Sequence, residues 1–111
     1  MTLKVLIPAK TAEIVQTTQY TSPSGTRTII DKFTATNDSG APITLTVNLV
    51  NSGGAPGADN LILPAKTIPA GAVEEMYELV GHVLAQGDSI STIADVDSTL
   101  VIRASGRQFA G

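Results

Sequence analysis

Short runs of alternating apolar and polar residues, separated by clusters of turn-forming residues, recur along the whole chain. The clearest run is ITLTVNLV (43–50), in which aliphatic residues at the odd positions alternate with threonine and asparagine: Ile43, Leu45, Val47, Leu49. Strict alternation is the pattern of a strand that buries one face. The chain is also rich in Thr, Ile and Val, whose branched side chains pack well on a pleated surface. These features together predict an all-β fold.

Six further strand-like runs follow one another at a spacing of roughly 8–12 residues. They are TLKVLIP (2–8), EIVQTTQY (13–20), 26–37, 61–73, 88–95 and 98–109. Pro8 has no backbone N–H, so pairing of the first run is expected to stop there. The number and spacing of the runs predict an antiparallel β-sandwich that is either immunoglobulin-like or jelly-roll-like.

The runs 26–37 and 43–50 are joined across NDSGAP (37–42), a strong turn signal, and are predicted to form a β-hairpin. Three residues of the first run are expected to share one face, with Asp31 as an interruption: Ile29, Phe33, Ala35.

EEMYELVGHVL (74–84) is the one segment in which a helix competes with a strand, because four apolar residues recur at roughly helical spacing. They are Met76, Leu79, Val80 and Val83. Gly81 would end such a helix within two turns. We expect a short helical turn that carries the chain from one sheet to the other.

A length of 111 residues suits a single domain. Residues 1–12 are interpreted as an N-terminal extended arm or as the first strand, and 13–111 as the sandwich domain. The chain has no cysteine, which excludes disulfides and thiolate metal sites. No apolar run has the length of a signal peptide or a membrane span, so we expect a soluble protein made in the cytoplasm.

The charge pattern argues against direct nucleic-acid binding. The formal net charge is −3, the seven basic residues are scattered, and only four aromatic residues are present. Only 15% of the residues are charged. A weakly charged, Thr-rich surface would suit a protein that is packed into an assembly.

His82 is the only histidine, with Glu78 before it and Asp88 after it. A nucleophilic triad would need an activated serine, but neither Ser89 nor Ser91 lies in a Gly-x-Ser-x-Gly turn. A zinc site would need a second histidine or cysteines. We therefore expect a structural histidine that caps a turn or packs against an aromatic ring, and predict no catalytic, cofactor-binding or metal-binding residues and no enzymatic activity.

Two acidic groups and one loop are candidate sites. Asp95 and Asp97 could begin a calcium loop, but the glycine and bidentate glutamate of such a loop are missing. Three glutamates that could serve a glycosidase lie within five residues of one another and are interpreted as an acidic turn: Glu74, Glu75, Glu78. NSGGAPGADN (51–60) lacks the spacing of a phosphate-binding loop and is predicted to be an exposed connection.

The segment 33–109 resembles a family of small virion-associated proteins of tailed bacteriophages. The resemblance rests on Phe-x-x-x-Asn (33–37), NLVNSGG (48–54), IPAG (68–71), ELVGHVL (78–84), GDSI (87–90) and RASGRQ (103–108). It implies a β-sandwich structural protein without enzymatic activity that is built into a virus particle beside capsid, neck or tail proteins. It also implies that Leu79 and Val80 fill the core, that Gly81 turns the chain, and that His82 occupies the corner. We also expect a homo-oligomer, without a predicted number of subunits.

The leading hypothesis is therefore a capsid decoration or cement protein. A neck, collar or tail accessory protein is the nearest alternative. The rival from another class is a carbohydrate-binding or immunoglobulin-like adhesion module that uses the 51–60 loop. Sugar sites usually stack rings on aromatic side chains, of which the chain has Tyr20, Phe33, Tyr77 and Phe109. Residues 1–12 could act as an arm that pairs with a neighbour's open sheet edge.

Overall fold

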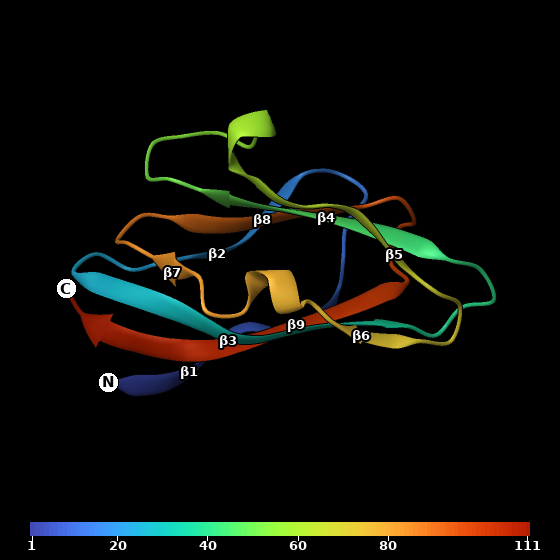
Figure 1. Ribbon diagram of the computed structural model, residues 1–111, viewed down its shortest axis with the longest axis horizontal. Coiled ribbons are helices and arrows are strands. Elements are labelled where there is room, and N and C mark those ends of the chain that lie inside the picture. Colours follow the sequence, from blue (N-terminus) through green and yellow to red (C-terminus); the bar gives the residue numbers. More distant parts are fainter.

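The computed structural model describes all 111 residues as two antiparallel sheets packed face to face (Figure 1). Sheet A has the order β1 (Thr2–Thr11), β9 (Leu100–Ala110), β3 (Thr26–Asn37) and β6 (Val73–Glu75), and β7 (Val83–Leu84) also pairs with β3. Sheet B has the order β2 (Thr17–Thr21), β8 (Ser89–Ala94), β4 (Ile43–Val50) and β5 (Leu61–Ile68). The predicted all-β antiparallel sandwich is confirmed.

The strand order is that of a jelly roll. The first strand pairs with the last, and the chain passes from one sheet to the other after β1, β2, β3, β5, β7 and β8. β6 and β7 both pair with β3, so they act as one interrupted strand. β4 and β5 are the only strands adjacent in sequence that are hydrogen-bonded to each other. Of the two sandwich types expected, the structure therefore has the jelly-roll arrangement.

The predicted hairpin between 26–37 and 43–50 is wrong, because β3 lies in sheet A and β4 in sheet B. The connection is an arch held by Asn37, whose side chain is fully buried. Its Nδ2 donates to the carbonyl oxygens of Ala41 (2.8 Å) and Ile68 (2.9 Å), and its Oδ1 accepts from the Ser39 N–H (3.0 Å). The turn residues were correctly recognised, but they specify a reversal of the chain and not the sheet that the next strand joins.

A β-bulge at Asp31 changes which residues of β3 face the core. The register with β9 shifts between Ile30 and Lys32. Thr28 and Ile30 are buried before the bulge, and Phe33 and Ala35 after it. The prediction that Ile29 shares a face with Phe33 and Ala35 is therefore wrong, since one inserted residue reverses the alternation.

β1 does not end at Pro8 as expected but continues to Thr11. Its register with β9 shifts between Val5 and Ile7 and again between Ile7 and Lys10, so Pro8 lies within a bulge. β1 is an edge strand, where a residue without an N–H is tolerated.

The short helical turn expected within 74–84 is confirmed as a 3-10 turn, η2 (Tyr77–Leu79), and Gly81 follows it with a φ of +89°. Leu79 is fully buried as expected, whereas Val80 is 37% exposed, so its expected place in the core is wrong. The segment also begins and ends on sheet A, at β6 and β7. The chain crosses to sheet B only afterwards, between Leu84 and Ser89.

The core is one cluster of 19 buried residues between the two sheets. Phe33 is the only aromatic residue in it, so Ile, Leu, Val and Ala fill most of the space. Gly106 lies on β9 beside this core, opposite Ile30 of β3. No helix in the structure has the length and apolar character needed to cross a membrane.

We expect Gly106→Ala to lower the free energy of unfolding by about 3 kcal/mol, because overpacking a tight site forces the backbone to shift. A Cβ at this position would overlap the Ile29 carbonyl oxygen and lie 2.9 Å from Leu6 Cδ1. Gly40→Ala is the matched control, since a Cβ there meets nothing within 4 Å and should change stability by less than about 0.5 kcal/mol. Urea denaturation measures both, and equal effects would contradict this packing.

Candidate interaction surface

The three residues around the single histidine do not form a site. The His82 ring is exposed and makes no hydrogen bond, although the His82 carbonyl oxygen accepts one from the Ile30 N–H (3.1 Å). Glu78 forms an ion pair with Lys66, with 3.2 Å between Oε1 and Nζ. A backbone hydrogen bond and the Lys66 ammonium hold the pKa of Glu78 below its ordinary value. The histidine does lie in a turn as expected, but its ring caps nothing.

Two aspartates among the candidate functional residues, Asp88 and Asp95, instead support the connections between strands. Asp88 accepts hydrogen bonds from the backbone N–H groups of Ala85 and Ser52, both at 2.9 Å. Asp95 accepts one from the Thr44 N–H at 2.8 Å. Both carboxylates thus satisfy backbone donors at points where the chain passes between sheets. No group of three His, Asp or Glu side chains is placed to hold a metal ion.

The remaining candidates are separated as well. Glu75 pairs with Lys32 across β6 and β3, with 3.5 Å between Oε1 and Nζ, and Glu74 makes no side-chain hydrogen bond. Ser89 and Ser91 lie on β8 in sheet B, and the Ser91 hydroxyl accepts a hydrogen bond from Gln16 Nε2. The structure brings none of these carboxylates or serines to His82.

The outer face of sheet A carries an apolar strip that the sequence analysis did not identify. Alternate residues of β9 from Leu100 to Gly106 are buried, so Arg107 and Phe109 point outward. Register then places Leu3, Arg107, Ile29 and Val83 in one row across β1, β9, β3 and β7. We use the name apolar strip for five side chains of this face: Leu3, Val5, Ile29, Val83, Phe109. Leu3 is 77% exposed and Val83 is 56% exposed, and apolar side chains that are exposed together on one face often mark a contact surface.

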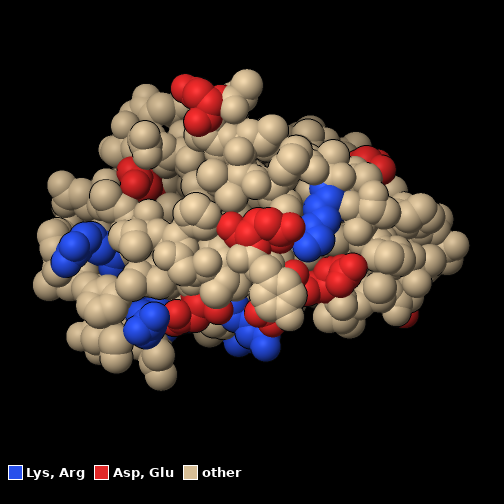
Figure 2. All heavy atoms as spheres, in the orientation of Figure 1, with Lys and Arg blue, Asp and Glu red and all other residues tan.

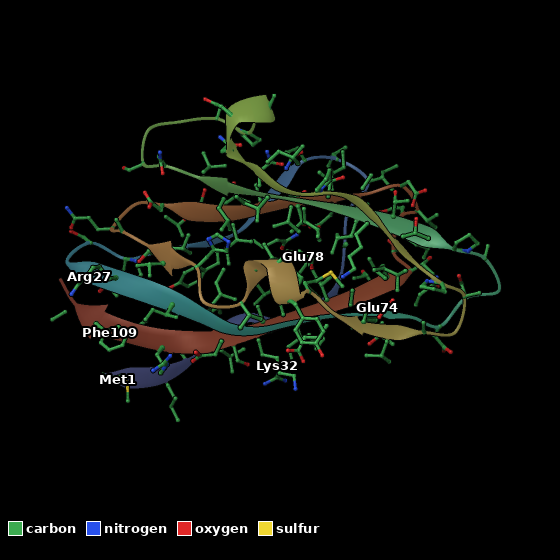
Figure 3. The ribbon with its side chains drawn as sticks, viewed as in Figure 1. Met1, Arg27, Lys32, Glu74, Glu78 and Phe109 are labelled. Atoms are coloured by element: carbon green, nitrogen blue, oxygen red, sulfur yellow. The ribbon has the colours of Figure 1, made fainter.

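A small hollow lies within the strip. It has a volume of about 160 Å³ and is lined by Arg27, Ile29, Val83 and Phe109. Figure 3 shows Arg27 and Phe109 at the same end of the molecule as Met1. The hollow is therefore apolar with one guanidinium at its rim, and Arg27 makes no ion pair.

Within the strip, between Leu3 and Ile29, Arg107 forms a two-point ion pair with Asp31 across β9 and β3. Nη2 lies 2.9 Å from Oδ1, and Nε lies 2.9 Å from Oδ2. Hydrogen bonding to Asp31 raises the pKa of the Arg107 guanidinium above its ordinary value. The bulge that reverses the alternation of β3 thus also places Asp31 within reach of Arg107.

Charge is distributed unevenly over the molecule. The outer face of sheet A holds four basic and two acidic residues, which are Arg27, Lys32, Arg103, Arg107, Asp31 and Glu75. The rest of the chain holds the other three basic and eight acidic residues. In Figure 2 most of the visible basic atoms lie along the lower left, and the right-hand end shows only acidic ones.

The end of the sandwich far from the chain termini is acidic and also exposes apolar side chains. The connections 12–16 and 95–99 meet there, because the Ala94 N–H donates to the Glu13 carbonyl oxygen at 2.9 Å. The connection 38–42 lies at the same end, next to the start of β9. We use the name acidic end for these three connections, with the following exposed or partly exposed residues: Glu13, Ile14, Val15, Asp38, Asp95, Val96, Asp97. Asp38 and Asp97 have no side-chain partner, and Lys10 is paired with Glu13.

The 51–60 loop is exposed as predicted and is folded over the outer face of sheet B (Figure 1). It contains the 3-10 turn η1 (Ala58–Asn60), and Asn48 Nδ2 anchors it by donating to Gly57 O (3.0 Å) and Asn60 Oδ1 (2.7 Å). Beside the loop lies an open hollow of about 610 Å³ lined by polar and small residues, which include Ser22, Ser52 and Gln86.

The aromatic residues do not form a sugar platform. Phe33 is buried in the core as expected, and the Tyr20 hydroxyl is hydrogen-bonded to Thr28 (2.7 Å) and Gln108 (2.8 Å). Tyr77 is the one largely exposed aromatic side chain. Phe109 belongs to the apolar strip and is half-buried there.

Comparisons of the chain with protein-family models, with curated proteins and with solved structures found no match.

We expect His82→Ala to change the free energy of unfolding by less than about 0.5 kcal/mol, because the ring is exposed and makes no hydrogen bond. Asp88→Ala should cost about 1–3 kcal/mol, because it leaves the Ala85 and Ser52 N–H groups without their acceptor. Thermal and urea unfolding of the two variants test this, and a larger loss for His82→Ala would contradict it.

Glu13 should titrate below its ordinary pKa of 4.5, because hydrogen bonds from Lys10 and Gln19 stabilise its charged form. A lowered pKa in the folded state contributes stability at higher pH, and this contribution is lost as the pH falls below about 4.5. Carboxyl NMR titration measures the pKa. In Lys10→Met the value should move back toward 4.5, whereas an unchanged value would exclude Lys10 as the cause.

Proposed function

We propose that this chain is a non-enzymatic structural protein of a tailed-phage particle, with capsid decoration or cement as its leading role. Its partners would be capsid, neck or tail proteins and further copies of itself. The proposal is supported chiefly by the apolar strip on the outer face of sheet A, a surface that contact with a neighbouring subunit would bury.

The fold is compatible with this role. Jelly rolls are the architecture of many viral capsid domains, but also of lectins and cupins, so the fold alone does not select a function. The resemblance of residues 33–109 to small virion-associated proteins favours the first of these classes.

The position of β1 supplies a second argument. β1 is an edge strand whose free side has no partner, and Leu3 and Val5 of the apolar strip lie on it. In the single chain this segment pairs with β9, with unbroken register from Thr2 to Val5. An open edge beside an exposed apolar face is a suitable surface for adding a neighbouring subunit.

The alternative is a carbohydrate-binding module. It is favoured by one observation, the open polar hollow beside the 51–60 loop, which offers hydroxyl and amide groups. It is weakened by the aromatic residues, since Tyr77 on η2 is the only largely exposed ring. Binding of free glycans by the isolated chain, lost in Gln86→Ala, would favour this alternative.

Co-sedimentation tests the proposed function. The purified chain is mixed separately with heads and with tails of the phage that carries its gene, and each mixture is run on a density gradient. Stoichiometric recovery with heads is expected for a decoration or cement protein. Recovery only with tails or necks would move the role there, and recovery with no particle fraction would overturn the structural role.

A paired variant tests whether the apolar strip makes the contact. Leu3→Asp with Val5→Asp should reduce recovery with particles by roughly tenfold or more, because charged groups would enter a dehydrated contact. Both positions are exposed, so the fold should be retained. Leu61→Asp is the control, since Leu61 is also exposed but lies on β5 of sheet B, away from both the strip and the acidic end. If the wild-type chain, the paired variant and the control are recovered equally, the apolar strip does not make the contact with the particle.

A further inference from the structure

We propose that the apolar strip binds the acidic end of a second copy of this chain, so that copies associate head to tail. The inference names a partner for the surface used in the proposed function and rests on its being an assembly surface.

Charge favours the acidic end of a second copy, and not its apolar strip, as the partner surface. The outer face of sheet A has twice as many basic as acidic residues, so two such faces brought together would repel each other. The acidic end has the opposite sign and contains no basic residue. Asp38 and Asp97 are unpaired there, and Glu13 pairs with Lys10 at the end of β1. Complementary charge of this kind favours one pairing of surfaces and disfavours the alternatives.

Apolar groups are present on both surfaces, so the contact would not rest on charge alone. Val96 is exposed at the tip of the acidic end, between Asp95 and Asp97. The hollow between Ile29, Val83 and Phe109 is apolar and has room for an aliphatic side chain. With Val96 in this hollow, the carboxylate of Asp97 would meet the guanidinium of Arg27 at the rim. Both groups lack an ion-pair partner within the chain.

A single molecule cannot make this contact with itself. The strip includes Ile29, near the start of β3, and the acidic end begins after Asn37 at the other end of that strand. Eight residues of strand separate them by about 26 Å, at roughly 3.3 Å per residue. A contact between two different surfaces at opposite ends repeats from copy to copy, and it closes into a ring or grows as a filament.

Sedimentation velocity of the purified chain tests the inference without any phage particle. Association is expected over roughly 1 µM to 1 mM, the range of dissociation constants typical of small contacts, and it should weaken as salt is raised. Arg27→Glu and Asp97→Lys should each raise the apparent dissociation constant at least tenfold. Asp59→Lys is the matched control, because Asp59 is exposed on η1, away from both surfaces.

Mixing the two variants distinguishes contact between the strip and the acidic end from contact between two strips. Arg27→Glu keeps an intact acidic end, and Asp97→Lys keeps an intact strip. An equimolar mixture should therefore recover association, because each variant supplies the surface that the other has lost. Circular dichroism confirms that each variant is folded, and Val96→Ser, which changes no charge, should also weaken association.

Three results would overturn the inference. The first is a wild-type chain that stays monomeric from roughly 1 µM to 1 mM. The second is association that Asp97→Lys does not weaken. The third is a mixture of Arg27→Glu and Asp97→Lys that does not associate. Particle recovery that persists without self-association would leave the proposed function standing and remove only the second copy as partner. Self-association without particle recovery would support the second copy as partner and contradict the structural role in a phage particle.

Discussion

The pairing of β9 with both β1 and β3 is the interaction on which the rest of this structure depends. β9 lies at the centre of sheet A, and without it β1 has no partner and β3 keeps only the short strands β6 and β7. The pairing joins Thr2 to Gln108, so residues from the two ends of the chain must meet before sheet A exists. Such long-range contacts carry a large loop-closure cost and slow folding.

The close fit of this pairing has a local cause in Gly106. The backbone of β3 passes so near β9 at this point that no side chain fits, and the bulge at Asp31 follows immediately. The bulge turns Ile29 outward and places Asp31 beside Arg107. One inserted residue therefore links the packing of the core to the composition of the outer face.

The all-β class, the turns and most of the strands could be predicted from the sequence, because alternation and turn residues are local signals. The partners of the strands could not. NDSGAP reverses the chain whether the next strand joins the same sheet or the opposite one. The arch is held by the hydrogen bond from the buried Asn37 side chain to Ile68 O on β5, 31 residues away, which no local pattern reveals.

The surfaces were harder to predict than the fold. The apolar strip combines residues from β1, β3, β7 and β9. The bulge decides which residues of β3 face outward, and a prediction from strict alternation does not include a bulge. A signal did exist, since Asp31 interrupts an otherwise apolar alternation. Conversely, the cluster suggested by His82, Glu78 and Asp88 was an effect of sequence proximity, and the structure assigns the two carboxylates to separate partners.

The two chain termini lie together at one end of sheet A (Figure 1). Leu3 and Phe109 of the apolar strip are each within a few residues of a terminus. Any affinity tag or fused domain at either terminus would therefore sit beside the strip and mask it. The 51–60 loop, which projects from sheet B, is the insertion point that leaves both this surface and the acidic end uncovered.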